Sequence, residues 1–107
     1  MPYSTNLYTG PASAELMTLY TVPAGYVAVV RDVEYFNSSG DTIDDLYVVA
    51  EVPGPLAATF AYVASLASNA GAQWQGRVVV PAAGFLEVGA YGSGLLLIVS
   101  GYLLSSP

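Results

Sequence analysis

The residues of this sequence that are best suited to chemistry are its carboxylates. The chain has 107 residues, with eight Asp and Glu, two Arg, and no His or Cys. Asp32 and Glu34 are two positions apart, so on a β-strand they project from the same face, about 7 Å apart. That separation could serve inverting glycoside hydrolysis, for which Glu51 and Glu87 are further candidates. Acids that alternate along a strand are also typical of a solvated face, so we expect this second role and no catalytic residue.

The densest acidic segment of the chain contains Asp41, Asp44 and Asp45. Ca²⁺ prefers six to eight oxygen ligands, and three nearby carboxylates could begin such a site. The spacing does not follow the twelve-residue calcium loop, and no bidentate Glu follows at the required place. We therefore expect a solvated turn and no metal, while the sequence leaves cation binding by this loop open.

Aromatic side chains are the second group with binding potential, since the chain has nine Tyr and one Trp. Aromatic faces stack on sugars, but Tyr and Trp are also enriched at protein interfaces. Only 9% of the residues are charged, whereas soluble surfaces usually have about 25–35%. A surface so poor in charge favours burial against other protein. We therefore expect an interface formed by Tyr62, Trp74, Tyr91 and Tyr102.

The composition excludes several classes of function. Without Cys and His, disulfides, zinc knuckles, iron–sulfur clusters and Ser-His-Asp arrangements are absent. A net charge of -6 and a pI of about 4.1 argue against nucleic-acid binding. The mean hydropathy is +0.54, but the apolar run over residues 95–104 is too short for a membrane-spanning helix, which needs about 20 residues. We expect a protein that is not an enzyme, with no cofactor and no nucleic-acid or membrane partner.

The elements that would position these side chains are β-strands. Val, Tyr, Thr and Ile are abundant, and Gly or Pro interrupts the sequence about every eight to twelve residues, as in sandwiches and barrels. The Ala-rich segment 56–67 is the one helical candidate, but its β-branched and aromatic residues favour a strand. The predicted strands are Asn6–Thr9, Met17–Val22, Tyr26–Asn37, Asp45–Val52, Thr59–Leu66, Gln73–Val80, Phe85–Tyr91 and Leu95–Leu104.

The long predicted strand Tyr26–Asn37 indicates which of its faces is buried. Strict alternation gives one row that is more apolar than the other, and we expect this row to face the core. The row consists of Val27, Val29, Arg31, Val33 and Tyr35. Arg31 is its one charged residue, and we expect it to extend to the surface or to pair with an acid on a neighbouring strand.

Two segments of the chain have similar sequences, Val22–Val27 and Val80–Leu86. In each, an apolar strand runs into Pro, small residues and Gly, and then restarts with an aromatic residue. Pro and Gly in such positions form tight turns. We interpret the two segments as equivalent hairpins in a fold of two sheets.

These patterns predict an all-β fold, a single two-sheet β-sandwich of about eight strands, jelly-roll or immunoglobulin-like in character. A chain of this length supports one compact domain, which we assign to residues 16–107. Residues 1–15 are rich in Ser, Thr, Gly and Pro. We expect them to form an N-terminal arm that becomes ordered when it packs on a neighbouring molecule.

From Leu19 onward, the sequence pattern of strands and turns resembles that of small β-sandwich virion proteins of tailed bacteriophages. The segments that carry the resemblance are Leu19–Gly25, Val29–Val33, Asn37–Gly40, Trp74–Pro81, Gly84–Val88 and Val99–Leu104. They include no catalytic or ligand-binding motif, so no functional residue is implied.

The resemblance implies a non-enzymatic virion protein, and chains of this size within that group are often capsid decoration, or cement, proteins. Such a protein binds the outside of the head lattice, with the major capsid protein or another virion protein as its partner, and a homotrimer is the oligomer we expect. The alternative is a tail or receptor-binding module that attaches to the host or to carbohydrate. In either case the expected location is the virion.

Overall fold

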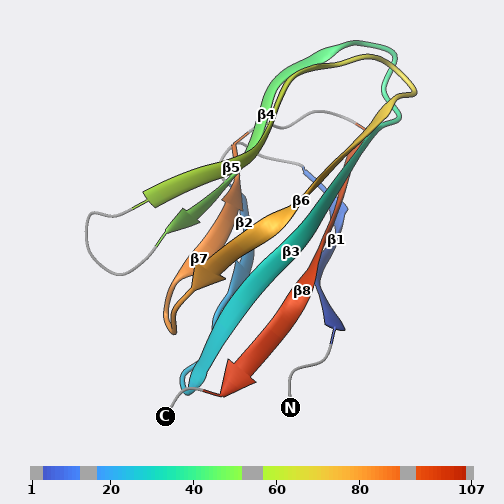
Figure 1. Cartoon of the computed structure of the whole chain (residues 1–107). Coiled ribbons are helices and arrows are strands. Elements are labelled where there is room, and N and C mark those ends of the chain that lie inside the picture. Colours follow the sequence, from blue (N-terminus) through green and yellow to red (C-terminus); the bar gives the residue numbers. More distant parts are fainter. Residues whose placement is uncertain (1–3, 13–16, 52–56, 90–93, 106–107) are drawn as a thin grey trace.

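Eight β-strands make up the computed structural model of the chain (Figure 1). The structure describes residues 4–12, 17–51, 57–89 and 94–105, and none of these belongs to a helix of the length and hydropathy that membrane crossing requires. The strands are β1 (Ser4–Pro11), β2 (Met17–Thr21), β3 (Tyr26–Asn37), β4 (Ile43–Glu51), β5 (Ala57–Leu66), β6 (Gly71–Val80), β7 (Phe85–Val88) and β8 (Leu95–Ser105). The predicted all-β class is confirmed.

The strands form two antiparallel sheets of four. Sheet A has the strand order β1-β8-β3-β6, and sheet B has the order β2-β7-β4-β5. The pairs β1·β8, β2·β7, β3·β6 and β4·β5 are those of one long antiparallel hairpin folded back on itself. Rolling that hairpin places successive pairs in opposite sheets, which is the jelly-roll topology. Of the two architectures expected from the sequence, the strand order selects the jelly roll.

The predicted strand positions agree closely with the structure. β3 has the bounds predicted for it, and the segment with mixed signals forms β5 rather than a helix. β4 begins at Ile43, two residues before the predicted start at Asp45. The preference of β-branched and aromatic residues for strands therefore decided the ambiguous segment correctly.

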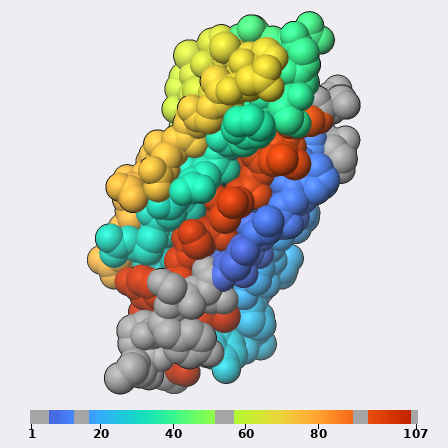
Figure 2. Space-filling model, turned by 90° about the vertical axis from the view of Figure 1, so that its right-hand side faces the viewer, coloured from blue at the N-terminus to red at the C-terminus, as the bar shows by residue number. Residues whose placement is uncertain are grey.

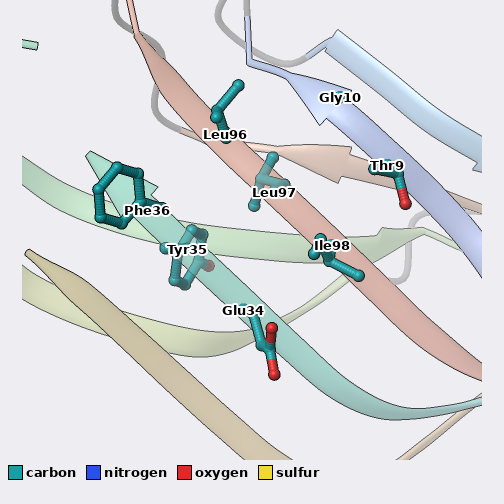
Figure 3. Close-up of a pocket in the computed structure, with 8 residues that line it drawn as sticks. All are labelled: Thr9, Gly10, Glu34, Tyr35, Phe36, Leu96, Leu97 and Ile98. Atoms are coloured by element: carbon teal, nitrogen blue, oxygen red, sulfur yellow. The ribbon is translucent and has the colours of Figure 1, made fainter. Parts of the chain in front are cut away.

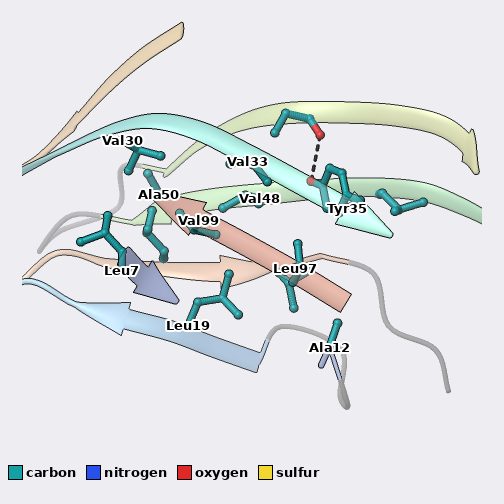
Figure 4. Close-up of a cluster of buried hydrophobic side chains, with 14 of the residues drawn as sticks. Leu7, Ala12, Leu19, Val30, Val33, Tyr35, Val48, Ala50, Leu97 and Val99 are labelled. Atoms are coloured by element: carbon teal, nitrogen blue, oxygen red, sulfur yellow. Dashed lines mark hydrogen bonds between the residues drawn. The ribbon is translucent and has the colours of Figure 1, made fainter. Parts of the chain in front are cut away.

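The core lies between the two sheets and consists mainly of Val and Leu. Val99 of sheet A and Val48 of sheet B are both fully buried in it (Figure 4). Tyr35 of β3 is also buried, and its hydroxyl donates a hydrogen bond of 2.9 Å to the backbone oxygen of Ala61 in β5. Burial raises the pKa of the Tyr35 hydroxyl. This bond joins the two sheets across the core.

A β-bulge at Arg31 interrupts the alternation of β3. The register with β8 passes from Val30 opposite Gly101 to Asp32 opposite Ser100, so Arg31 has no partner residue in that strand. Its side chain is exposed. The bulge thus removes the one charged residue from a row that strict alternation would direct at the core.

The bulge also changes which residues before it face the core. After the bulge, Val33 and Tyr35 point inward as predicted. Before it, the other row points inward, and Ala28 is fully buried. Val27 is only partly buried, and Val29 is buried but lies outside the cluster between the sheets. The prediction that these two residues face the core was wrong, because strict alternation does not allow for an inserted residue.

The two similar turns do not close hairpins. The turn at Pro23–Gly25 carries the chain from β2 in sheet B to β3 in sheet A, and the turn at 81–84 carries it from β6 to β7. They lie against each other, because the Val22 N–H donates to the Gly84 oxygen at 2.9 Å and the Ala83 N–H donates to the Val22 oxygen at 3.1 Å. The hairpin interpretation was wrong. The shared sequence marks two crossovers between the sheets at one end of the sandwich.

Part of the expected N-terminal arm lies within the sandwich. Residues 4–11 form β1, an edge strand of sheet A that pairs with β8. Leu7 and Ala12 belong to the buried core cluster. This arrangement brings Thr9 and Gly10 beside β8 on the outer side of the molecule.

Candidate functional site

The outer face of sheet A exposes large hydrophobic side chains on its two central strands. Phe36 on β3 is 43% exposed, and Leu96 and Ile98 on β8 are 42% and 41% exposed. Phe36 lies opposite Leu96, and Glu34 lies opposite Ile98, so the three side chains share one surface. We call these three residues the apolar cluster. Figure 2 shows this face, on which β1, β8, β3 and β6 run side by side.

A hollow of about 420 Å³ lies among the strands that carry the apolar cluster. In Figure 3, Glu34 and Phe36 project from β3, Leu96 and Ile98 from β8, and Thr9 from the neighbouring β1. The hollow is lined by Thr9, Gly10, Glu34, Tyr35, Phe36, Leu96, Leu97 and Ile98. Sites for small ligands occupy about 300–1,000 Å³ and are mostly apolar. The hollow is therefore large enough for a bulky apolar side chain of another molecule.

At two positions near the hollow, Gly10 on β1 and Gly71 on β6, there is no side chain to cover it. A Cβ at Gly10 would lie 3.0 Å from the hydroxyl of Tyr8, which donates to the Pro11 oxygen at 2.6 Å and so lies along β1. Gly71 lies opposite Phe36 and leaves that side of β3 without a covering side chain. A second hollow of about 290 Å³ is found there, lined by Glu34, Tyr35, Gly71, Ala72 and Gln73.

The predicted acid pair lies beside the hollow. Asp32 and Glu34 project from the outer face of β3, as their spacing predicts. The Gln73 amide donates to Asp32 at 2.7 Å and to Glu34 at 3.4 Å, and the Gln75 amide donates to Asp32 at 3.3 Å. Side-chain amides, rather than an arginine, thus donate hydrogen bonds to both carboxylates. The pair gives the apolar hollow an acidic border.

Tyr62, one of the four predicted interface residues, lies on sheet B. Its side chain is 59% exposed, and its hydroxyl donates to the Asp45 carboxylate at 2.8 Å. This hydrogen bond raises the pKa of the Tyr62 hydroxyl. Ala61 has a positive φ of 57° where the register of β4 and β5 is irregular, and Asp45, just before the irregular part of β4, has a φ of 55°. The irregular backbone turns Tyr62 toward solvent.

The other predicted interface residues do not join Tyr62. The Trp74 ring is half-buried against the core, with its centroid 5.0 Å from that of Phe60. It lies so close to Gly76 that a Cβ there would be 2.6 Å from the ring. Tyr102 is half-buried on sheet A, opposite Val29. Tyr91 lies outside the described residues. The structure therefore does not bring Tyr62, Trp74 and Tyr102 together into one aromatic platform.

Aromatic residue types alone do not predict the apolar cluster, because two of its three members, Leu96 and Ile98, are aliphatic. A signal was present in Leu95–Val99, where five consecutive residues are apolar. A strand of an antiparallel sandwich buries one face and normally alternates with polar residues on the other. An unbroken apolar run in such a strand predicts a hydrophobic outer face as well, and this is where Leu96 and Ile98 lie.

Sheet B carries a second carboxylate pair. Glu87 of β7 lies opposite Val49 of β4. Glu51 is two residues further along β4, so its side chain projects from the same outer face, close to Glu87. A hydrogen bond with Glu51, followed by desolvation, raises the pKa of Glu87 to about 7. The pair therefore binds a proton at a higher pH than an isolated carboxyl group would.

The acidic segment is fixed mainly through its backbone. Asn37 is fully buried, and its amide donates to the backbone oxygen of Asp41 at 2.8 Å and to that of Leu66 at 3.0 Å. The Asp45 carboxylate accepts a hydrogen bond from the Tyr62 hydroxyl and does not converge with the other acids of the segment. Within the residues that the structure describes, which include this segment, no three acids are grouped as a metal site.

Comparisons of the chain with protein-family models, with curated proteins and with solved structures found no match. Function therefore has to be inferred from the surfaces described above.

Proposed function

We propose that the chain is a non-enzymatic structural protein of a bacteriophage virion, most simply a capsid decoration protein that binds the outside of the head. The observation that carries this proposal is the apolar cluster, three large side chains exposed together on one face. Exposed clusters of this kind mark protein-interaction surfaces. In the proposed role, the outer face of sheet A contacts the capsid subunits.

The energy of this contact has a natural scale. Fully burying a large apolar side chain contributes about 1.5–3 kcal/mol, so covering the exposed parts of the cluster contributes roughly 2–4 kcal/mol. Association of two proteins costs more than this in lost freedom of motion. The cluster can therefore act as a hot spot, while stable attachment requires further contacts or several copies joined together. A trimer that binds at several points of a lattice meets this requirement.

The charge of the protein supports the same role. With only ten charged residues and a net charge of -6, the chain has few groups for electrostatic steering and none of the basic clusters that bind nucleic acid. Apolar contacts without electrostatic steering give affinity through slow dissociation rather than through fast association. The jelly-roll topology also occurs in viral capsid domains, although it occurs in lectins and cupins too.

Cosedimentation of the purified protein with phage heads that lack it tests the proposal. We expect saturable binding, and density distributed over the whole shell when the complex is imaged. Native mass spectrometry of the free protein should show a trimer. A protein that stays monomeric at high concentration and does not sediment with heads would contradict the proposal.

Tyr62 and Asp45 favour a second candidate, a tail or receptor-binding module. An exposed aromatic ring beside a carboxylate can stack on a sugar and accept hydrogen bonds from its hydroxyls. A glycan array would separate the two roles. Binding to glycans that is lost in Tyr62→Ala, together with density at the tail tip only, would favour attachment over decoration.

A further inference from the structure

The hollow on sheet A is built to receive a large apolar group. The exposed side chains of Phe36, Leu96 and Ile98 border it, and only the small residues Thr9 and Gly10 line it from β1. Its volume of about 420 Å³ is enough for a Leu, Phe or similar side chain together with part of its backbone. Water in such a place makes few hydrogen bonds with the lining, so an apolar occupant is favoured.

One side of the hollow is acidic. Glu34 is exposed, lies opposite Ile98, and lines both this hollow and the second hollow beyond β3. Asp32 lies one strand repeat away on the same face. Both carboxylates accept hydrogen bonds from the neutral amides of Gln73 and Gln75, which do not neutralise their charge. The occupant that complements this border therefore has a positive charge next to its apolar group.

A second copy of the chain does not supply that charge well. The chain has only two cationic side chains against eight acids. Arg31 and Arg77 are exposed on β3 and β6 of this same sheet, but neither of them lines the hollow. Two copies whose hollows face each other would therefore bring their Glu34 carboxylates together. Like charges at an interface oppose association. Charge complementarity thus favours a different protein.

We propose that the hollow binds a segment of a partner protein that inserts one large apolar side chain beside Phe36 and Ile98 and places a neighbouring Lys or Arg against Glu34. The proposal deepens the proposed function, on which it rests for the identity of the partner as a capsid protein. It assigns one specific contact chemistry to the apolar cluster and its acidic border.

Two capped dipeptides of opposite charge provide the test, namely the acetylated amides of phenylalanyl-arginine and phenylalanyl-glutamate. Each is titrated into the ¹⁵N-labelled protein, and amide shifts are followed by NMR. We expect the arginine peptide to shift the signals of Phe36, Leu96 and Ile98, and to bind about five-fold more tightly than the glutamate peptide, which is the factor given by one charge contact in water.

Variants separate the apolar and the charged contributions. Glu34→Gln keeps the shape of the border, so the two peptides should bind it equally. Phe36→Ser should weaken both peptides, since it removes one wall of the hollow. Glu51→Gln on sheet B removes an acid elsewhere and should leave the five-fold preference unchanged. Because Phe36 and Glu34 are exposed, the amide spectra of these variants should show an intact fold.

Three results would overturn the proposal. They are equal affinity of the native protein for both peptides, shifts that lie away from the hollow, and shifts of the hollow signals with protein concentration alone that disappear in Phe36→Ser. The last result would identify a second copy as the occupant. If the protein binds phage heads but shows no preference for the arginine peptide, only this inference fails. If the preference is present but heads do not bind, only the proposed function fails.

Discussion

The outer faces of the two sheets expose different kinds of side chain. On sheet B, Tyr62 donates to Asp45, and Glu87 shares a hydrogen bond with Glu51. On sheet A, each member of the apolar cluster stays about two-fifths exposed beside a hollow. A polar group can be satisfied by one partner in its own chain, whereas exposed apolar surface is removed from water only when another molecule covers it. This difference is why we propose sheet A, and not sheet B, as the contact face.

The largest effect is expected from a substitution that distorts sheet A itself. A Cβ at Gly101 of β8 would lie 1.9 Å from the backbone oxygen of Val29, so the two central strands would have to separate. We expect Gly101→Ala to lower the free energy of unfolding by about 3 kcal/mol or more. Urea denaturation measures this change.

Gly40→Ala is the matched control, because a Cβ there meets nothing within 4 Å. It should change stability by no more than about 0.5 kcal/mol. Equal denaturation midpoints for the two variants would contradict the close approach of β8 and β3.

The next largest effect is expected on binding, and it is measured with one variant on each outer face. Phe36→Ser removes a central member of the apolar cluster, and we expect it to weaken attachment to heads by about 2 kcal/mol, or about 30-fold. Tyr62→Ser removes the most exposed aromatic residue of sheet B and should leave attachment unchanged. Quantitative cosedimentation gives both values. A larger loss for Tyr62→Ser would transfer the contact to sheet B.

A smaller effect is expected at the bond that joins the two sheets. Tyr35→Phe leaves the Ala61 oxygen without its buried donor and should destabilise the fold by about 1–2 kcal/mol. Tyr8→Phe is the control, because its hydrogen bond to Pro11 is exposed and water can replace it. If both variants unfold at the same urea concentration, the bond between the sheets contributes nothing.

The smallest effect is the pH dependence that sheet B contributes. The folded-state pKa of Glu87, about 7, lies above its ordinary value of 4.5, so the folded chain holds this proton more tightly than the unfolded chain. The stabilisation is complete below pH 4.5 and is lost as the pH rises to about 7. Urea titrations across this range should show stability falling.

Glu51→Gln should flatten this decline, because it removes the carboxylate that raises the pKa of Glu87. Asp32→Asn on sheet A should leave the decline in place. An identical slope in native protein and Glu51→Gln would show that the pair does not share a proton.

The fold was predictable to a large extent, and the site was not. Turn residues and β-branched residues act over a few neighbours, so β3 was predicted with its observed bounds. Interface residues were predicted from residue type alone. Trp74 is a suitable type, yet its ring packs on Phe60, and Tyr62 and Tyr102 lie on strands of opposite sheets. Whether an aromatic residue is available for binding depends on what the rest of the chain places over it.

Short-range features of the chain were enough to establish its all-β class, the approximate number and positions of its strands, and its low content of charged residues. Three features depended on contacts between distant segments: the jelly-roll order of the strands, the pairing of Glu51 with Glu87, and the hollow between β1, β3 and β8. The bulge at Arg31 belongs with them, because a bulge is defined by the register of a neighbouring strand. Strand formation follows from local preferences, but pairing between strands is a choice among many long-range alternatives that only packing of the whole chain decides.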